Sequence, residues 1–394
     1  MIDFRNVDQW NIGNDEVKKA WLNGTLVWEK PDIISPFYVE NITNSNETLS
    51  IEATVNPSST ITVEYSTDTL SWSTLGDIST TPITYTLTPG SILYLRASTN
   101  TWKNCEINGM SKVGGNIMSL LYGSNFTGQE VSFPSSVSQI FIGLFAGDTH
   151  LQSASHLVLP VTTLTNSCYK AMFGSCTSLV DAPALPATTL VESCYQNMFN
   201  GCTSLVDAPA LPATTLAEWC YSGMFLGCTS LVTAHDLHGN RVYRDSCTNM
   251  FKGCTSLVDA PALPATTLAS YCYTGMFEGC TSLVDAPALP AGNLMAYCYI
   301  YMFKDCINLV GTPELLAQTL VNGCYNYMFQ GCSKVDYIKC TARYIDMGNV
   351  DHTKSWVSGV SSTGTFVKAR STVDFDWHTG VNGIPTGWTV QDAS

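Results

Sequence analysis

The sequence predicts an α/β solenoid of parallel strands and short helices, preceded by a β-hairpin and a small β-sandwich and followed by a β-rich cap. Three observations support this fold class. The phrase CTSLVDAPALP begins at Cys176 and returns unchanged at Cys202, Cys254 and Cys280. An MF pair recurs at a constant interval through the middle of the chain, and both flanks are β-rich and punctuated by turn residues. A fixed period with small residues at set offsets is typical of stacked repeats.

The first element, residues 1–31, is predicted to contain a β-hairpin. VKKAWLNGTLVWEK alternates apolar and polar residues around Asn23-Gly24, the strongest short-range hairpin signal. Because an isolated hairpin is marginal in water, we expect it to dock on something, and we interpret 1–31 as an attachment module.

The second element, residues 36–109, is predicted to be a small β-sandwich of the fibronectin or immunoglobulin-like kind. Short β-rich runs such as TLSIEATVN, TITVEYSTD and SILYLRAST follow one another with Gly, Pro, Asn and Asp turns between them. Residues 110–140 are then a linker and an N-terminal cap for the repeats.

The third element, residues 141–340, consists of eight predicted repeat units. Aligning on the MF pair places phenylalanines from Phe173 to Phe329 at strict 26-residue intervals, and Phe145 begins a degenerate 28-residue unit before them. Such units cannot bury their apolar faces alone and must stack on their neighbours.

Each unit is predicted to contain a short helix. ATTLVESCYQNMFNGC places Leu190, Cys194 and Met198 at i, i+4 and i+8, which is one apolar helix face. Thr189 with Glu192 fits a capping box, and a glycine follows where a helix C-cap favours it.

A short parallel strand is predicted to follow the helix. The piece from Leu205 to Ala210 fits the L-x-x-L-x-L strand of a leucine-rich repeat if Leu205, Ala208 and Ala210 point inward. Proline cannot donate to a ladder, so the strand should end near Pro209. The fold class is therefore an α/β leucine-rich-repeat solenoid with short convex helices, closed by a β-rich, off-period C-terminal cap over residues 341–394.

The cysteines are predicted to be buried and unbridged. Fifteen of the 16 lie at Cys168 or beyond, mostly as C-x7-C pairs such as Cys194 with Cys202. Free cysteine is among the most buried residue types, which favours small side chains stacking from unit to unit. Two alternatives are less favoured: zinc prefers closely spaced C-x2-4-C pairs, and disulfides need an oxidising compartment. No metal and no cofactor is predicted.

The charge and the hydropathy of the sequence argue against several classes of function. A net charge of −14 with 18 Lys and Arg argues against a nucleic-acid binder and against binding to anionic membranes. MIDFRNVDQWNIGNDEVKK has no apolar run like that of a signal peptide, and no segment approaches 18 uninterrupted apolar residues. We expect a soluble cytoplasmic product that reaches any outside surface by cell lysis or by assembly into a particle.

Catalytic constellations are scarce in the sequence. G-x-S-x-G, H-E-x-x-H and P-loop motifs are missing, so we predict no catalytic residue and no enzyme. Asp374, Asp376 and His378 in DFDWH could form a metal or acid–base cluster, although a solvated loop is the simpler interpretation. The six histidines are His150, His156, His235, His238, His352 and His378.

Four aspartates fall at the same predicted strand position in different units: Asp181, Asp207, Asp259 and Asp285. Carboxylates in adjacent units should stand roughly 5 Å apart across a parallel ladder. Like charges at that spacing repel and raise one another's pKa unless something binds them. A cation, a basic partner or plain solvation would each relieve the repulsion, and all three remain open.

One unit breaks the repeated phrase and is the predicted binding site. At Cys228 the frame reads CTSLVTAHDLH, so Thr233 interrupts the acidic column. Verbatim copies act as a scaffold, whereas a ligand site needs chemistry that no neighbour shares; drift at tolerant positions is the alternative. Histidine changes charge between pH 5 and 8, so we expect binding there to depend on pH. The polar and aromatic residues that the unit brings in are His235, Asp236, His238, Arg241, Tyr243 and Arg244.

The run CYxxMFxGCTSLVxAPxLPATTL resembles the BspA-like leucine-rich repeats of bacterial surface proteins and of phages and prophages of gut Bacteroidales. The resemblance covers roughly Phe141 to Cys340, about half the chain. VKKAWLNGTLVWEK, VGGNIMSLLYGSNF and GVNGIPTGWTV are more distantly similar to pieces of large gut-phage tail proteins.

This resemblance implies a structural and receptor-binding protein of a phage tail, either a tail fibre or a tail-tip component, located in the virion. Its N-terminal region would bind other tail proteins, its repeats would recognise a host cell-surface glycan or protein, and self-association into a homo-oligomer is compatible with such a role. The alternative is an adhesin-like interaction protein of the same repeat family, located at a bacterial cell surface or in the cytoplasm.

Overall fold

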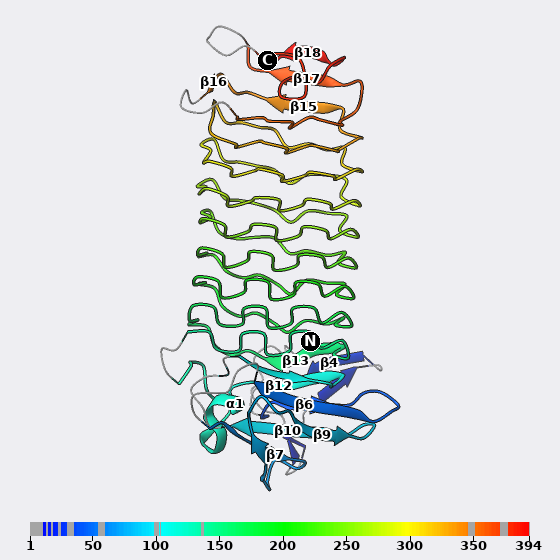
Figure 1. Cartoon of the computed structure of the whole chain (residues 1–394), viewed down its shortest axis with the longest axis vertical. Helices are drawn as coiled ribbons and strands as arrows, with labels where there is room; N and C mark the ends of the chain where they lie inside the picture. Colours follow the sequence, from blue (N-terminus) through cyan, green and yellow to red (C-terminus); the bar gives the residue numbers. More distant parts are fainter. Residues whose placement is uncertain are drawn as a thin grey trace.

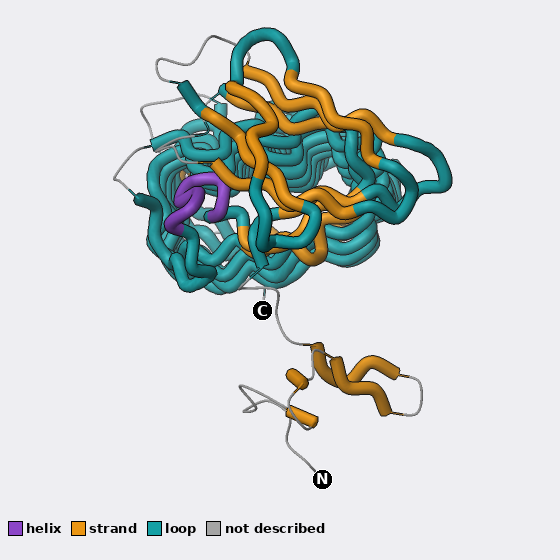
Figure 2. Tube along the Cα trace, turned by 90° about the horizontal axis from the view of Figure 1, so that it is seen from below, coloured by secondary structure: helices purple, strands orange, loops and turns teal. Residues whose placement is uncertain are grey.

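The molecule is a straight column of stacked coils with a β-sandwich at one end and a small parallel sheet at the other (Figure 1). This computed structural model describes the backbone of strands β1 to β4 and residues 35–53, 60–97, 102, 104–134, 138–345, 351–370 and 377–393. Seen along the long axis, the coils lie nearly one behind another, and the sandwich strands cross the end of the column (Figure 2).

Two small antiparallel pairs precede the sandwich. β1 (Asn11–Ile12) pairs with β2 (Asp15–Glu16), and β3 (Lys19–Leu22) pairs with β4 (Thr25–Glu29). The second pairing agrees with the hairpin that the alternating sequence predicts, although the Asn23-Gly24 turn itself lies outside the described residues.

The sandwich is built from two sheets whose alternate side chains face each other. In β6, Leu49, Ile51 and Ala53 are buried while the residues between them are not, which is the period of two of a half-buried strand. The six-stranded sheet has the order β13-β12-β5-β10-β7-β8, and the three-stranded sheet has the order β11-β6-β9. The strands of this part are β5 (Tyr38–Glu40), β6 (Glu47–Ala53), β7 (Thr62–Ser66), β8 (Ser73–Asp77), β9 (Ile83–Leu87), β10 (Ile92–Ala97), β11 (Cys105–Asn108) and β12 (Lys112–Asn116).

The sandwich continues directly into the column. β13 (Ser153–Val158) belongs to the first repeat unit and pairs in parallel with β12 at the edge of the large sheet. Ser153 in turn forms a parallel bridge with Asp181 in the next coil. The sheet edge is therefore covered by the first coil, which removes an exposed edge strand.

Each coil has a turn-rich side with a regular hydrogen-bonding pattern. Alternate amides bond across coils, as from Phe199 N to Met224 O at 2.9 Å, and the others bond three residues back, as from Met198 N to Tyr195 O at 3.2 Å. Every fourth residue adopts a left-handed conformation; in one coil these are Ser193, Asn197 and Gly201, with φ of 57°, 56° and 74°.

The prediction of a helix in each repeat unit is wrong. An α-helix needs negative φ at every residue, whereas φ is positive at every fourth residue on the turn-rich side of the coil. Cys194 and Met198 are nevertheless both buried, because a period of four in consecutive turns places the same side chains inward as a helical period of 3.6. Among the described residues the one α-helix is α1 (Ser119–Tyr122), which precedes a short 3-10 turn, Gly123–Asn125.

The predicted repeat strands are also wrong. Described residues 159–318 contain isolated parallel bridges, such as those between Asp207 and Thr233 and between Thr189 and Thr215, but neither strand nor helix. The DAPALP frame carries two prolines that cannot donate, so no ladder extends beyond a single bridge. Ala210, expected inward, is exposed, and Leu211 is buried instead. The chain is β-rich at its ends, and the α/β leucine-rich-repeat solenoid is not the fold it adopts.

The core of the column is a stack of identical aromatic rings. Phenylalanines from Phe145 to Phe329 lie face to face in successive coils, with centroids 5.3 to 5.8 Å apart. The stack begins in the sandwich, where Phe37 lies 6.0 Å from Phe145. Parallel, offset rings at these distances add to the free energy of burial, so each unit stabilises the next.

The cysteines line the same core. All 16 are buried and none is bridged in the structure, which confirms the predicted burial. Several donate to a backbone carbonyl of the preceding coil, as Cys202 Sγ does to Phe173 O at 3.0 Å. These thiols therefore act as small core residues that also satisfy a polar backbone group.

A small parallel sheet closes the far end of the column. β15 (Tyr337–Cys340), β17 (Thr365–Lys368) and β18 (Thr389–Asp392) pair in parallel, and β14 (Thr319–Leu320) pairs with β16 (Tyr344–Ile345). The buried Trp356 lies 6.2 Å from Tyr325 and 5.5 Å from Trp377. One large ring thus covers the end of the aromatic stack.

Candidate functional site

The unit that breaks the repeat lies in the middle of the column and exposes both of its histidines. His235 and His238 stand where other coils have prolines, and both side chains are exposed to solvent. In this coil Leu237 N donates across coils to Ala262 O at 3.1 Å. Asp236 Oδ1 accepts from Ala262 N at 2.7 Å, so this predicted binding residue also holds two coils together.

Arg241 lies over a tyrosine ring at the outer edge of this coil. Its guanidinium carbon is 5.0 Å from the ring centre of Tyr243, which is within cation–π distance. Arg241 is exposed, and Tyr243 is partly buried against the core. Two of the predicted site residues are therefore in contact, with a cation held on an aromatic face.

Arg244 contacts the next coil. Its guanidinium carbon is 6.0 Å from the ring centre of Tyr271, and its Nε lies 3.3 Å from Asp245 Oδ2. Asp245 also accepts from Thr248 Oγ1 at 3.2 Å. The arginine is exposed, so its ion pair is a solvated one of small energetic value.

The broken unit also departs from its neighbours in the core. Ser246 and Cys247 stand where the next coil has Cys272 and Tyr273, so the tyrosine stack has no ring between Tyr221 and Tyr273. The Ser246 hydroxyl is fully buried and makes no hydrogen bond of good geometry within the described residues. Burial raises the pKa of the Cys247 thiol, and the adjacent Ser246 hydroxyl offsets this only in part.

The four aspartates of the acidic column are all exposed. Asp259 and Asp285 form a parallel bridge in adjacent coils, and Asp207 bridges to Thr233, so the interruption of the column at the broken unit is real. Solvent reaches all four side chains. Within the part of the chain that the structure describes, no three His, Cys, Asp or Glu residues are arranged to hold a metal ion.

The structure joins some of the predicted site residues and leaves others apart. The bridge between Asp207 and Thr233 brings the acidic column next to the broken unit, two residues before His235 in the chain. The guanidinium of Arg241 contacts the ring of Tyr243. No hydrogen bond joins His235 or His238 to an arginine among the described residues. Sequence reasoning missed Tyr271; the signal was that the coil after the broken unit carries a tyrosine at the position that Asp245 occupies in the broken unit.

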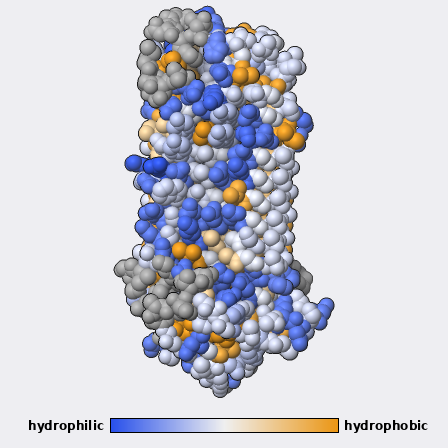
Figure 3. Space-filling model, viewed as in Figure 1, coloured by the Kyte–Doolittle hydropathy of each residue, from blue (hydrophilic) through white to orange (hydrophobic). Residues whose placement is uncertain are grey.

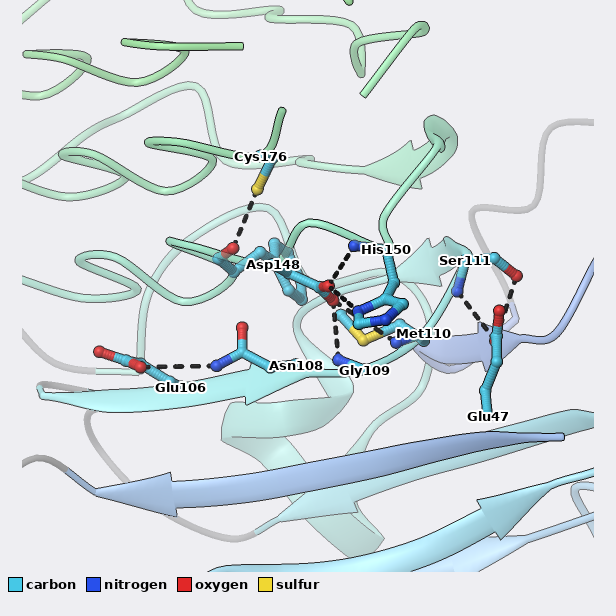
Figure 4. A network of polar contacts seen from close by, with 10 residues as sticks. Glu47, Glu106, Asn108, Gly109, Met110, Ser111, Asp148, His150 and Cys176 are labelled. Atoms are coloured by element: carbon cyan, nitrogen blue, oxygen red, sulfur yellow. Dashed lines mark hydrogen bonds and ion pairs between the residues drawn. The ribbon is translucent and has the colours of Figure 1, made fainter. Parts of the chain in front are cut away.

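A second polar cluster lies where the sandwich meets the first coil (Figure 4). The carboxylate of Asp148, with 1% of its side chain exposed, accepts from the amides of Gly109 at 2.9 Å, Met110 at 3.4 Å and His150 at 2.8 Å. Beside it, Glu47 accepts from the amide and hydroxyl of Ser111, at 3.1 and 3.2 Å. These acceptors satisfy backbone donors, so the cluster is a structural joint.

The remaining histidines belong to no metal-binding cluster among the described residues, and most of the DFDWH segment lies outside them. His150 is exposed beside Asp148, with Nδ1 3.5 Å from Oδ1, and His352 is buried in the C-terminal cap. His378 is exposed, and Asp374 and Asp376 lie outside the described residues.

No protein-family model, curated protein or solved structure matches this chain. The resemblance to BspA-like repeats therefore stays a prediction. None of the helices in the described part of the chain is long and apolar enough to cross a membrane.

Proposed function

We propose that this chain is a recognition protein of a phage tail, in which the N-terminal region attaches to the particle and the column displays one binding unit to the host cell. The main support for the proposal is that the broken unit differs in its exposed residues from the other repeat units. The verbatim coils repeat the same inner and outer residues, whereas one coil exposes two histidines and two arginines that no other unit shares.

The architecture supports a display role. The column joins the sandwich through paired strands and a continuous ring stack rather than through a linker. A unit in the middle of the column is thereby held at a fixed distance and orientation from the N-terminal sandwich. Pre-organised surfaces of this kind lose little conformational freedom when they bind.

The chemistry of the displayed residues supports binding rather than bond cleavage. Arg241 and Arg244 lie exposed on tyrosine rings, and Asp236 accepts from a backbone amide of the next coil. The buried carboxylate of Asp148 likewise accepts from backbone amides. The polar groups described above are thus arranged for recognition and for stability.

Binding of the labelled full chain to gut Bacteroidales cells tests the recognition role. We expect saturable binding that unlabelled chain competes away, and gold-labelled antibody against the chain should decorate the tails of intact phage particles. Saturable binding to cells without decoration of particles would favour the adhesin-like alternative. Absence of saturable binding across a panel of host strains would contradict the proposed function.

A further inference from the structure

Arg241 and Arg244 are the only arginines between residues 141 and 340, and both belong to the broken unit. Both are exposed, and they are three residues apart, so their Cα atoms are separated by at most about 10 Å. Arg241 lies over the ring of Tyr243 and Arg244 lies over the ring of Tyr271, so each cation has its own aromatic partner.

The ring beneath Arg244 is followed by another ring in the next coil. The ring of Tyr271 is stacked on that of Tyr297 at 4.9 Å, and Asn322 Nδ2 donates to the Tyr297 hydroxyl at 3.0 Å. The residues Arg241, Tyr243, Arg244, Tyr271 and Tyr297 make up two cation–ring groups whose arginines are three residues apart, and they are here called the arginine–tyrosine strip. The rings of Tyr271 and Tyr297 are held by stacking and by a side-chain hydrogen bond before any ligand arrives.

The two tyrosines of the later coils occupy costly backbone positions. Tyr271 and Tyr297 have φ of 62° and 58°, in the left-handed region, where a residue with a Cβ costs roughly 1–2 kcal/mol. The same position is Ser193, Trp219 and Asp245 in earlier coils and Gly323 in a later one, so the fold does not require a tyrosine there. Both tyrosines are partly exposed and present part of their rings to solvent.

The arginines keep hydrogen-bonding capacity free. Arg241 has no ion-pair partner among the described residues, and Arg244 reaches one carboxylate, Asp245, through Nε alone. The other nearby carboxylates are Asp236, which accepts from a backbone amide, and Glu218 of the preceding coil, which is exposed. A guanidinium whose face rests on an aromatic ring presents its planar fork of N–H groups edge-on, which suits a bidentate carboxylate.

We infer that the arginine–tyrosine strip binds the acidic sugar units of an anionic polysaccharide. The sugar carboxylates pair with the two arginines, and the sugar rings lie along the tyrosines. This inference rests on the proposed function and specifies the chemistry of the host receptor. Because the chain carries a net charge of −14, long-range electrostatics oppose a polyanion, so binding at this strip depends on close contacts with the two arginines.

The test measures the affinity of the full chain for polygalacturonate, alginate and polysialic acid, with fully methyl-esterified polygalacturonate as the uncharged counterpart. Arg241→Thr and Arg244→Ser install the residues that Thr267 and Ser270 supply in the next coil. Each variant is expected to weaken binding about tenfold or more, the loss typical of a hydrogen bond to a charged group. Arg241→Lys keeps the charge but lacks the fork, so it should weaken binding as well.

A matched control removes two positive charges elsewhere on the column. Lys170→Gln with Lys334→Asn installs the residues that Gln196 and Asn308 supply in the neighbouring coils, and this double variant should bind within twofold of the parent. Circular dichroism shows whether each variant stays folded.

Three outcomes would overturn the inference. They are no binding to any of the acidic polymers, equal binding to the esterified polymer, and equal weakening by the control variant. If the parent binds host cells but Arg241→Thr and Arg244→Ser bind them unchanged, the inference fails while the proposed function stands. If cells are not bound at all, the proposed function itself fails.

Discussion

At the scale of single residues, the fold depends on the left-handed positions that recur every four residues. Most coils place glycine at the third of these positions, as at Gly227 and Gly331, because glycine has no Cβ to meet the carbonyl oxygen. Asp305 occupies the same position in its own coil with φ of 61°. The same left-handed backbone position is therefore occupied by unstrained glycine in most coils and by a strained residue, Asp305, in one coil.

These positions give the first prediction. A Cβ added at Gly227 meets nothing within 4 Å, so Gly227→Ala isolates the conformational cost and should lower the free energy of unfolding by about 1–2 kcal/mol. Asp305→Gly should raise it by up to about 1 kcal/mol, since the exposed ion pair of Asp305 with Lys304 contributes little. Urea unfolding monitored by fluorescence measures both. A neutral Gly227→Ala would contradict the left-handed assignment.

The buried thiols give the second prediction. Burial raises the pKa of Cys220, Cys272 and Cys306 to about 12 in the folded chain, and these thiols regain their ordinary pKa near 9 on unfolding. Because only the unfolded chain loses these protons above pH 9, stability should be level below about pH 8 and fall as pH rises through 9 to 12. The maximal slope is about 1.4 kcal/mol per pH unit for each thiol.

Urea unfolding in reductant between pH 7.5 and 10 measures this slope, and Cys220→Ala should reduce it by one thiol's share. Stability that does not change over that range, or rapid alkylation of the native thiols at pH 8, would show that the thiols are not buried as described.

At the scale of elements, the joint between the sandwich and the first coil depends on Asp148, whose carboxylate accepts three backbone amides. Removing that carboxylate leaves buried donors without an acceptor. Asp148→Ala should therefore lower the free energy of unfolding by about 1–3 kcal/mol, and Asp148→Asn, which keeps one oxygen acceptor, by less. The exposed Asp259→Ala is the control and should change it by less than about 0.5 kcal/mol. Equal effects of Asp148→Ala and Asp259→Ala would contradict the structural role of the joint.

The elements also show what could be predicted from sequence. The repeat period, the buried Cys194 and Met198, and the pairing of β3 with β4 follow from spacing and residue type. The absence of a repeat helix could not be predicted from the spacing, because a period of four fits both a helix and consecutive turns. The signal that separates the two is the small or polar residue at every fourth position, at Ser193, Asn197 and Gly201. The exposure of His235 agrees with expectation, whereas Tyr271 lies in a consensus coil and becomes a neighbour of Arg244 only through stacking.

At the scale of the whole molecule, one aromatic stack runs from Phe37 in the sandwich to Trp356 in the cap, with each coil adding one phenylalanine. The hydrophobic residues on the face seen in Figure 3 form only small, separate patches. A uniform scaffold with a single distinctive unit is suited to presenting one binding surface at a fixed position along the column.

The most direct test of this account exchanges units within the column. Replacing residues 234–245 by the consensus residues of 260–271 should leave the thermal midpoint unchanged or raised and weaken cell binding at least tenfold. Placing the original 234–245 sequence at 260–271 of that chimera should restore binding, since Tyr297 is then available to the transplanted arginine. Saturation binding to host cells measures all three chains. A consensus chimera that binds as tightly as the parent would show that the broken unit is not the recognition site.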